Sequence, residues 1–125
     1  MKSGDLLRLQ KKLLKQIEAK KFDAYISSIT LAKIIWIVRG ETENGRAKEV
    51  QDYLRELSEL RIVKIVPLND RVVYRMLNLV EKYSLTFVDA LVVSTAVDLK
   101  GIMVTREAGI RKAKEVKVII PEELV

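Results

Sequence analysis

Hydrophobic positions along the chain alternate between helical and strand-like spacing, with no internal repeat. In the first twenty positions, leucine and isoleucine recur every three or four residues, which is typical of an amphipathic helix. Later apolar runs are short and end at glycine, proline or polar residues, which predicts buried strands. We therefore expect helices at 4–20, 30–38, from 44, from 69 or 70, from 86 to Gly101 and at 107–114, and strands at 24–28, 62–66, 102–105 and 116–120.

Individual side chains refine the ends and faces of these elements. Thr30 is of a type that caps helix N-termini, so it should open the second helix. We expect the fourth helix to bury one apolar face. This face consists of Val73, Met76, Leu77 and Val80. Pro121 follows the last strand and should close the fold.

The order of the elements predicts the fold class. Strands separated by helices favour a parallel sheet, because parallel neighbours need crossover connections. The strands are short and apolar, as expected where helices cover both faces of a sheet. A length of 125 residues fits one compact domain. The sequence thus predicts an α/β protein with a single domain over 1–125 and three layers, α/β/α, around a mostly parallel sheet of about four strands.

Composition limits the chemistry that the chain can perform. It contains no cysteine and no histidine, which excludes nucleophilic catalysis of the Cys/His and Ser/His/Asp kinds. A metal site would need oxygen ligands, which suits Mg²⁺ or Mn²⁺ and argues against structural zinc. No apolar run is long enough to span a bilayer. We expect a soluble, cytoplasmic protein that does not interact with membranes.

The net charge of +6 is unevenly distributed. Residues 1–21 contain seven Lys/Arg and two acids, so a net charge of +5 lies in the first predicted helix. Such clustering is typical of proteins that bind polyanions. Lys11, Lys12 and Lys15 are accordingly candidates for contacts with RNA phosphates. They could equally form the solvated side of an amphipathic helix, and the sequence leaves both interpretations open.

Two acidic residues lie where α/β proteins bind hard cations, at a helix start and after a strand. Asp89 lies in the segment Phe-Val-Asp-Ala-Leu at 87–91, and Glu107 follows the apolar strand at 102–105 in Thr-Arg-Glu. Together with Tyr-Ile-Ser-Ser-Ile-Thr-Leu-Ala-Lys at 25–33, this pattern resembles the PIN domain family, the metal-dependent ribonuclease fold of VapC-type toxins. A plainer interpretation of Asp89 is a helix cap, because Thr86 and Asp89 have the spacing of a capping box. Glu107 would likewise suit the first turn of its own helix, so helix capping alone could explain both acids.

The resemblance implies a set of site residues. Asp89 and Glu107 match two of the four acidic positions of the family, and both would be catalytic and metal-binding. Lys33 stands where the family has a glutamate, in the first turn of the predicted helix. There it would oppose a metal ion, or replace the ion by pairing with Asp89 or Glu107. The expected substrate-binding residues are Lys33, Thr105 and Arg106, in addition to the lysines of the first helix.

The family's first acid lies at the end of a central strand, which has no counterpart here. The sequence therefore predicts a PIN-domain protein of the Mg²⁺-dependent endoribonuclease class with impaired activity. The alternative is a non-catalytic PIN-like module that binds RNA or protein. We expect either direct pairing of strands 24–28 and 102–105 or completion of the sheet by a second chain.

The resemblance also implies partners. VapC-like proteins bind small antitoxin proteins and self-associate, so the expected partners are RNA, an antitoxin and a second copy of the chain. The apolar helix residues Trp36, Ile37 and Tyr53 could supply surfaces for such partners. We predict instead that they pack into the core, because aromatic and isoleucine side chains are usually buried.

Overall fold

The computed structural model describes residues 12, 15–17, 19, 21–41 and 46–124. Most of the helix predicted at 4–20 lies outside this range. The elements appear in the order β1 (Ala24–Ser27), α2 (Ser28–Glu41), α3 (Arg46–Glu59), β2 (Val63–Val66), α4 (Asp70–Tyr83), α5 (Phe87–Leu99), β3 (Ile102–Val104), η1 (Ala108–Lys112), β4 (Lys117–Ile119) and α6 (Pro121–Leu124).

The strands pair in parallel, which confirms the predicted α/β class. β1 pairs with β2, and β3 pairs with β4. In the described part of the chain the four strands form two ladders of two strands rather than one continuous sheet. Direct pairing of the strands predicted at 24–28 and 102–105 was therefore wrong. Completion by a second chain stays a prediction.

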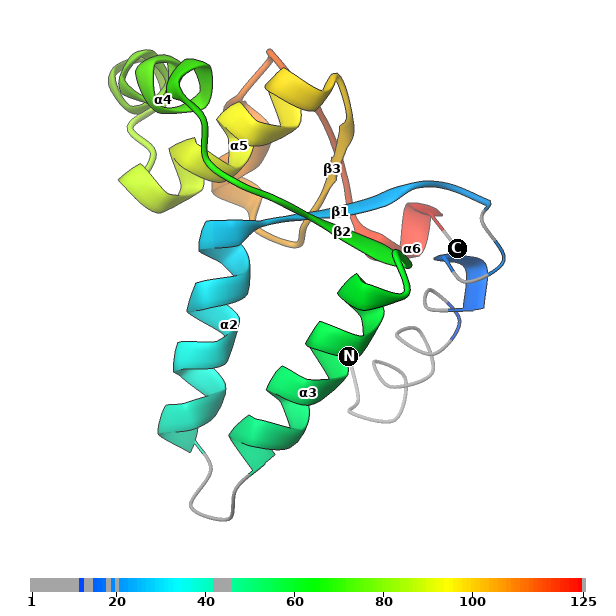
Figure 1. Ribbon diagram of the computed structural model, residues 1–125. Helices are drawn as coiled ribbons and strands as arrows, with labels where there is room; N and C mark the ends of the chain where they lie inside the picture. The colour runs from blue at the N-terminus through cyan, green and yellow to red at the C-terminus, as the bar shows by residue number, and fades with distance from the viewer. Residues whose placement is uncertain (1–11, 13–14, 18, 20, 42–45, 125) are drawn as a thin grey trace.

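The helices lie on two sides of the strands (Figure 1). α2 and α3 contact each other and extend together from β1 and β2. α4 and α5 make the most extensive helix pair, on the other side of these strands. This arrangement matches the helical layers expected from the sequence.

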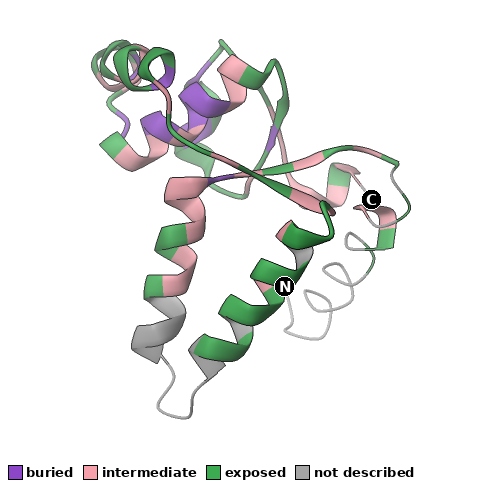
Figure 2. Ribbon diagram, in the orientation of Figure 1, coloured by how far each residue is buried: buried purple, intermediate pink, exposed green. Residues whose placement is uncertain are grey.

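The buried core lies in the C-terminal half of the molecule (Figure 2). Side chains from α4, α5, β3 and η1 and from the segments next to them form it. Its members are Leu79, Leu85, Ala90, Val93, Met103, Ile110, Ala113 and Val116. Between residues 24 and 66, Ser27 alone is buried among the side chains that the structure describes. The C-terminal half therefore supplies most of the packing on which the position of α5 depends.

The buried face of α4 differs from the predicted one. Val72 and Leu79, two turns apart, are buried, whereas Val73 and Leu77 are 41% and 57% exposed. Met76 and Val80 pack against the core, as expected. Burial on α4 is thus centred on a neighbouring stripe of the helix. The reason is that α4 packs along α5, and α5 is apolar around much of its circumference.

Helix boundaries differ from the predictions at several places, including the end of α2, which runs to Glu41 rather than to residue 38. The Ser27 Oγ accepts a hydrogen bond from the Ile29 amide at 3.3 Å, so α2 begins at Ser28, earlier than a Thr30 cap would allow. The segment predicted as a helix at 107–114 is a shorter 3₁₀ helix. Pro121 opens α6 instead of ending the fold, since proline is well suited to the first position of a helix.

The aromatic residues of α2 and α3 are more exposed than predicted. Trp36 is 71% exposed and Tyr53 is 45% exposed, so the prediction that they pack into the core was wrong. The side chain of Ile37 lies outside the described residues. The two aromatic side chains therefore lie on the surface of the α2–α3 pair.

Candidate functional site

The candidate site begins at the N-terminus of α5. Thr86 caps this helix, because its Oγ1 accepts a hydrogen bond from the Asp89 amide at 3.2 Å. Asp89 is half-buried in the first turn. Within the described residues no hydrogen bond or ion pair reaches its carboxylate. Thr86 therefore provides the cap, and the Asp89 carboxylate is not used for capping.

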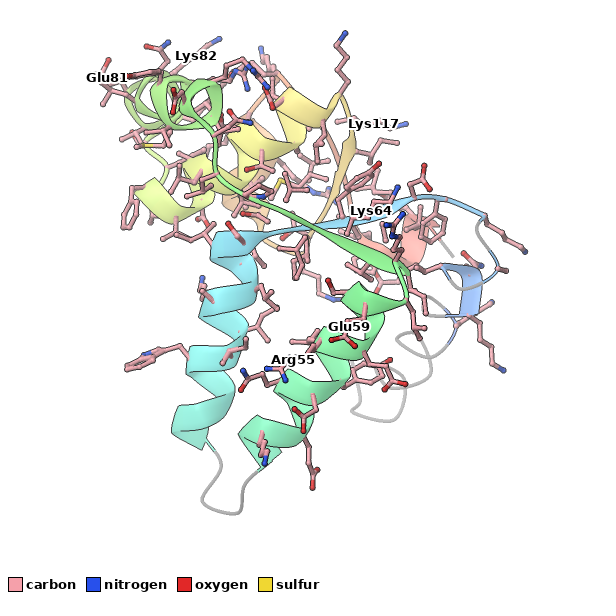
Figure 3. The ribbon with its side chains drawn as sticks, viewed as in Figure 1. Arg55, Glu59, Lys64, Glu81, Lys82 and Lys117 are labelled. Atoms are coloured by element: carbon pink, nitrogen blue, oxygen red, sulfur yellow. The ribbon has the colours of Figure 1, made fainter. Side chains whose placement is uncertain are left out.

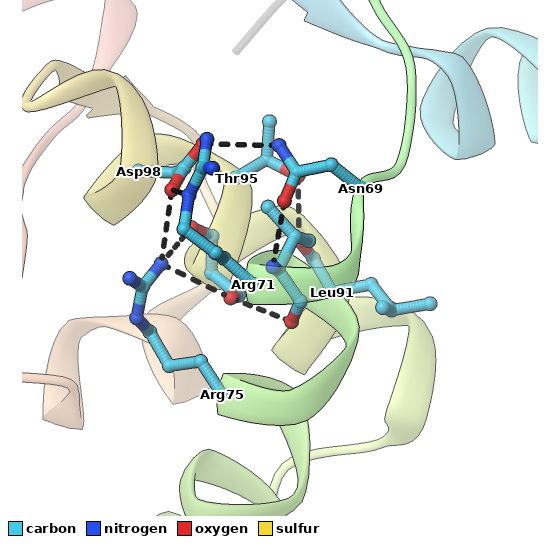
Figure 4. A network of polar contacts seen from close by, with 8 residues as sticks. Asn69, Arg71, Arg75, Leu91, Thr95 and Asp98 are labelled. Carbon is cyan, nitrogen blue, oxygen red and sulfur yellow. Dashed lines mark hydrogen bonds and ion pairs between the residues drawn. The ribbon is translucent and has the colours of Figure 1, made fainter.

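A polar network between α4 and α5 fixes the far end of α5 (Figure 4). The Asp98 carboxylate accepts hydrogen bonds from Arg71 Nε and Asn69 Nδ2, each at 3.1 Å. Arg71, and then Asn69, lower the pKa of Asp98 because they stabilise its charged form. Asn69 also caps α4 by accepting a hydrogen bond from the Val72 amide. One carboxylate thus joins the last turn of α5 to the start of α4.

A buried hydroxyl makes a second link between the same helices. Ser94 is fully buried, and its Oγ donates a hydrogen bond to the Val72 carbonyl at 2.8 Å. Arg75 Nη1 donates to the Ser94 carbonyl at 3.0 Å. Sequence reasoning missed this network, because its members look like ordinary surface residues until the two helices are packed. It orients α5 and so places Asp89.

Glu107 lies after β3, at the start of η1. Its side chain does not cap η1, and its amide donates a hydrogen bond to Thr105 Oγ1 at 3.2 Å. The Thr105 amide donates to the Ile119 carbonyl at 3.0 Å, extending the β3–β4 ladder. Arg106 forms an ion pair with Glu122. Contacts with β4 and α6 therefore fix the backbone of this segment, and the Glu107 side chain is exposed.

The fold brings the elements of the site to one region. α5 contacts both α2 and β3. A short turn joins the C-terminus of α5 to the start of β3, so the N-terminus of α5 lies toward the end of β3 that leads to Glu107 (Figure 1). Lys33 is exposed in the second turn of α2, not in its first turn as expected. Within the described residues it forms no ion pair with Asp89 or Glu107.

Comparison with known proteins assigns the fold to a family. A model of the PIN domain matches residues 7–116. The chain belongs to the PIN domain family. A solved structure described as a toxin-antitoxin complex from Klebsiella pneumoniae contains a similar chain, with 23% sequence identity, a TM-score of 0.65 and a match that covers 91% of this chain and 84% of that one. At this identity the likeness establishes the fold alone. No curated protein sequence matches this one.

PIN domains generally use divalent metal ions, so the fit of this donor set decides what the domain can bind. In the described ranges no group of three or more acidic side chains is placed to hold a metal ion. Asp89 and Glu107 supply two carboxylates, and the exposed cation of Lys33 belongs to the neighbouring helix α2. Mg²⁺ needs six oxygen ligands in near-ideal geometry. The donor set that the described residues supply therefore does not fit a tightly held ion.

The cations predicted to bind RNA are only partly described. Lys12 and Lys15 are exposed, and Lys11 lies outside the described residues. None of the described helices is both long and apolar enough to cross a bilayer.

A groove between α2 and α3 is a feature that the sequence did not indicate. Leu31 and Ile35 from α2 line it together with Leu54 and Arg55 from α3. Glu59, also on its wall, lies one turn from Arg55 on the same helix (Figure 3). The lining of the groove in this PIN domain is therefore mostly apolar and includes one residue of each charge.

Proposed function

We propose that this protein is a PIN domain of the metal-dependent endoribonuclease class, similar to VapC toxins, and that it cleaves RNA weakly. The observation that carries the proposal is the match to the PIN domain over 7–116 together with the position of Asp89. This residue lies in the first turn of α5, and its carboxylate is not used in the cap. Such a group is available to a ligand.

The weak activity follows from the donor set. Two carboxylates leave most of the coordination shell of Mg²⁺ to water and to RNA phosphates, which weakens binding in the absence of RNA. Lys33 adds repulsion, but it is exposed, so solvent and salt reduce its effect. The shortage of carboxylates is therefore the larger cause. Asp89 and Glu107 would hold such an ion, and the chemistry that it would supply is a water activated for hydrolysis of a phosphodiester.

The second candidate function is protein binding without catalysis, and the groove between α2 and α3 favours it. The apolar lining residues Leu31, Ile35 and Leu54 suit the apolar face of a partner helix. The exposed Trp36 lies on one of the two helices. A small antitoxin protein is the partner that we propose for this surface, in the cytoplasm.

A cleavage assay distinguishes the two functions. We expect slow cleavage of single-stranded RNA at millimolar Mn²⁺ that both a chelator and Asp89→Asn abolish. Asp23→Asn is the matched control, because Asp23 is an exposed aspartate before β1. Cleavage that survives the chelator and Asp89→Asn would contradict the metal-dependent class. No cleavage at any Mn²⁺ concentration, by a folded protein, would favour the binding module.

A further inference from the structure

The segment 100–117 is a second basic region of the chain. It contains six Lys/Arg and two acids, a net charge of +4, whereas residues 22–99 have a net charge of −1. All six cationic side chains are exposed. Positive charge is therefore concentrated again at the C-terminal half, on residues that the structure describes.

Buried side chains anchor this segment at every third position. Ile110, Ala113 and Val116 belong to the core. The residues between them face solvent, and their cationic members form a surface that we call the cationic ridge. The ridge consists of Arg111, Lys112, Lys114 and Lys117. Lys117 at the start of β4 points away from the body of the molecule (Figure 3). Because the backbone is anchored, binding a polyanion here requires little ordering of the chain.

The acid within the ridge segment is already paired. Glu115 accepts a hydrogen bond from Tyr83 Oη and lies 3.5 Å from Lys82 Nζ. Tyr83, followed by Lys82, lowers the pKa of Glu115. The Lys114 amide donates to the Tyr83 Oη at 3.2 Å, which fixes the backbone between two ridge cations. The Glu115 carboxylate therefore offsets the positive charge of Lys82 rather than that of the ridge.

We propose that the cationic ridge binds the phosphates of single-stranded RNA. The ridge begins four residues after Glu107, on the same η1 segment, so RNA bound there runs past the candidate site. Lysine and arginine contacts with phosphates are independent of base sequence, so the ridge supplies affinity and position rather than specificity. This proposal rests on the proposed ribonuclease class, since it supplies the substrate for that site.

The test compares two triple variants that lose the same charge. Arg111→Gln, Lys112→Gln and Lys114→Gln remove most of the ridge. The control replaces exposed cations on α3, β2 and the turn between them: Lys48→Gln, Arg61→Gln and Lys64→Gln. Affinity for a fluorescent single-stranded RNA is measured against salt, with chelator present so that cleavage cannot occur, and circular dichroism verifies folding.

We expect the ridge variant to bind RNA up to about 100-fold more weakly at 0.1 M salt. The slope of log affinity against log salt concentration should become smaller by up to about 2, because each lost phosphate contact removes about 0.7 from it. The control should change much less. Equal losses of RNA affinity in both variants would overturn the proposal that the ridge binds RNA and leave the ribonuclease class intact. Loss of binding to anionic phosphatidylserine vesicles with unchanged RNA binding would assign the ridge to a membrane surface and overturn it as well. If the unmodified protein binds no RNA, the ridge proposal fails; the Mn²⁺ cleavage assay separately decides the class.

Discussion

Replacement of Leu79 by alanine tests whether the core of the C-terminal half stabilises the fold. Leu79 is 2% exposed and packs within the main buried cluster. The change removes three carbon atoms, worth about 0.8 kcal/mol each in lost burial, or about 2.4 kcal/mol together. The cavity that remains adds to this loss, so we expect destabilisation of about 2 to 5 kcal/mol. That is a large part of the roughly 5 to 15 kcal/mol that stabilises a typical domain.

Leu77→Ala is the matched control on the same helix. Leu77 is exposed, so the same substitution should change the free energy of unfolding by less than about 0.5 kcal/mol. Urea unfolding followed by far-ultraviolet circular dichroism measures both variants, with the slope m fixed by the unmodified protein. Equal destabilisation by the two substitutions would refute the burial pattern of α4. A larger effect of Leu77→Ala would instead support the buried face of α4 that the sequence predicted.

Three further predictions concern the α4–α5 link and the first helix. Ser94→Ala should lower the free energy of unfolding by about 1 kcal/mol in urea, because it removes a buried hydrogen bond between helices. Thr95→Val is the comparison, since the Thr95 hydroxyl bonds within its own helix. A smaller loss of stability in Ser94→Ala than in Thr95→Val would contradict this role. The lowered pKa of Asp98 means that its contribution to stability is present above pH about 4 and is lost as the pH falls through the folded-state pKa. Acid titration of Asp98→Asn should thus show a shallower decline below pH about 4, and an unchanged profile would count against the network. Replacing Lys11, Lys12 and Lys15 by glutamine should weaken RNA binding and reduce its salt dependence; unchanged binding would leave those lysines a solvation role.

Much of the fold could be predicted because local signals agreed with the final packing. Asn69 and Thr86 cap α4 and α5 where the sequence indicated, and four strands occur close to the expected positions. The start of α2 was harder to predict, because Ser27 and Thr30 are both good caps. The structure uses Ser27, whose Oγ accepts a hydrogen bond from the Ile29 amide.

The burial of α4 and the pairing of the strands depended on tertiary contacts that periodicity does not contain. Val72 and Val73 are equally apolar, and contact with α5 determines which of them is buried. Likewise, nothing in four short apolar runs specifies that they form two separate ladders. Asp89 and Glu107 were identifiable from the sequence. The network around Asp98 that orients α5 was not, because the partners of Asp98 lie 27 and 29 residues from it in the chain.

The central claim is that the described residues of this PIN domain supply too few ligands for a tightly held divalent ion. Calorimetric titration with Mn²⁺ in the absence of RNA tests it most directly. Our account predicts a dissociation constant in the millimolar range or weaker, with tighter binding in Lys33→Glu, which adds a third carboxylate and removes a cation. Lys48→Glu, the same charge reversal on α3, should bind like the unmodified protein. One-site binding of Mn²⁺ at micromolar concentrations by the unmodified chain would contradict the claim.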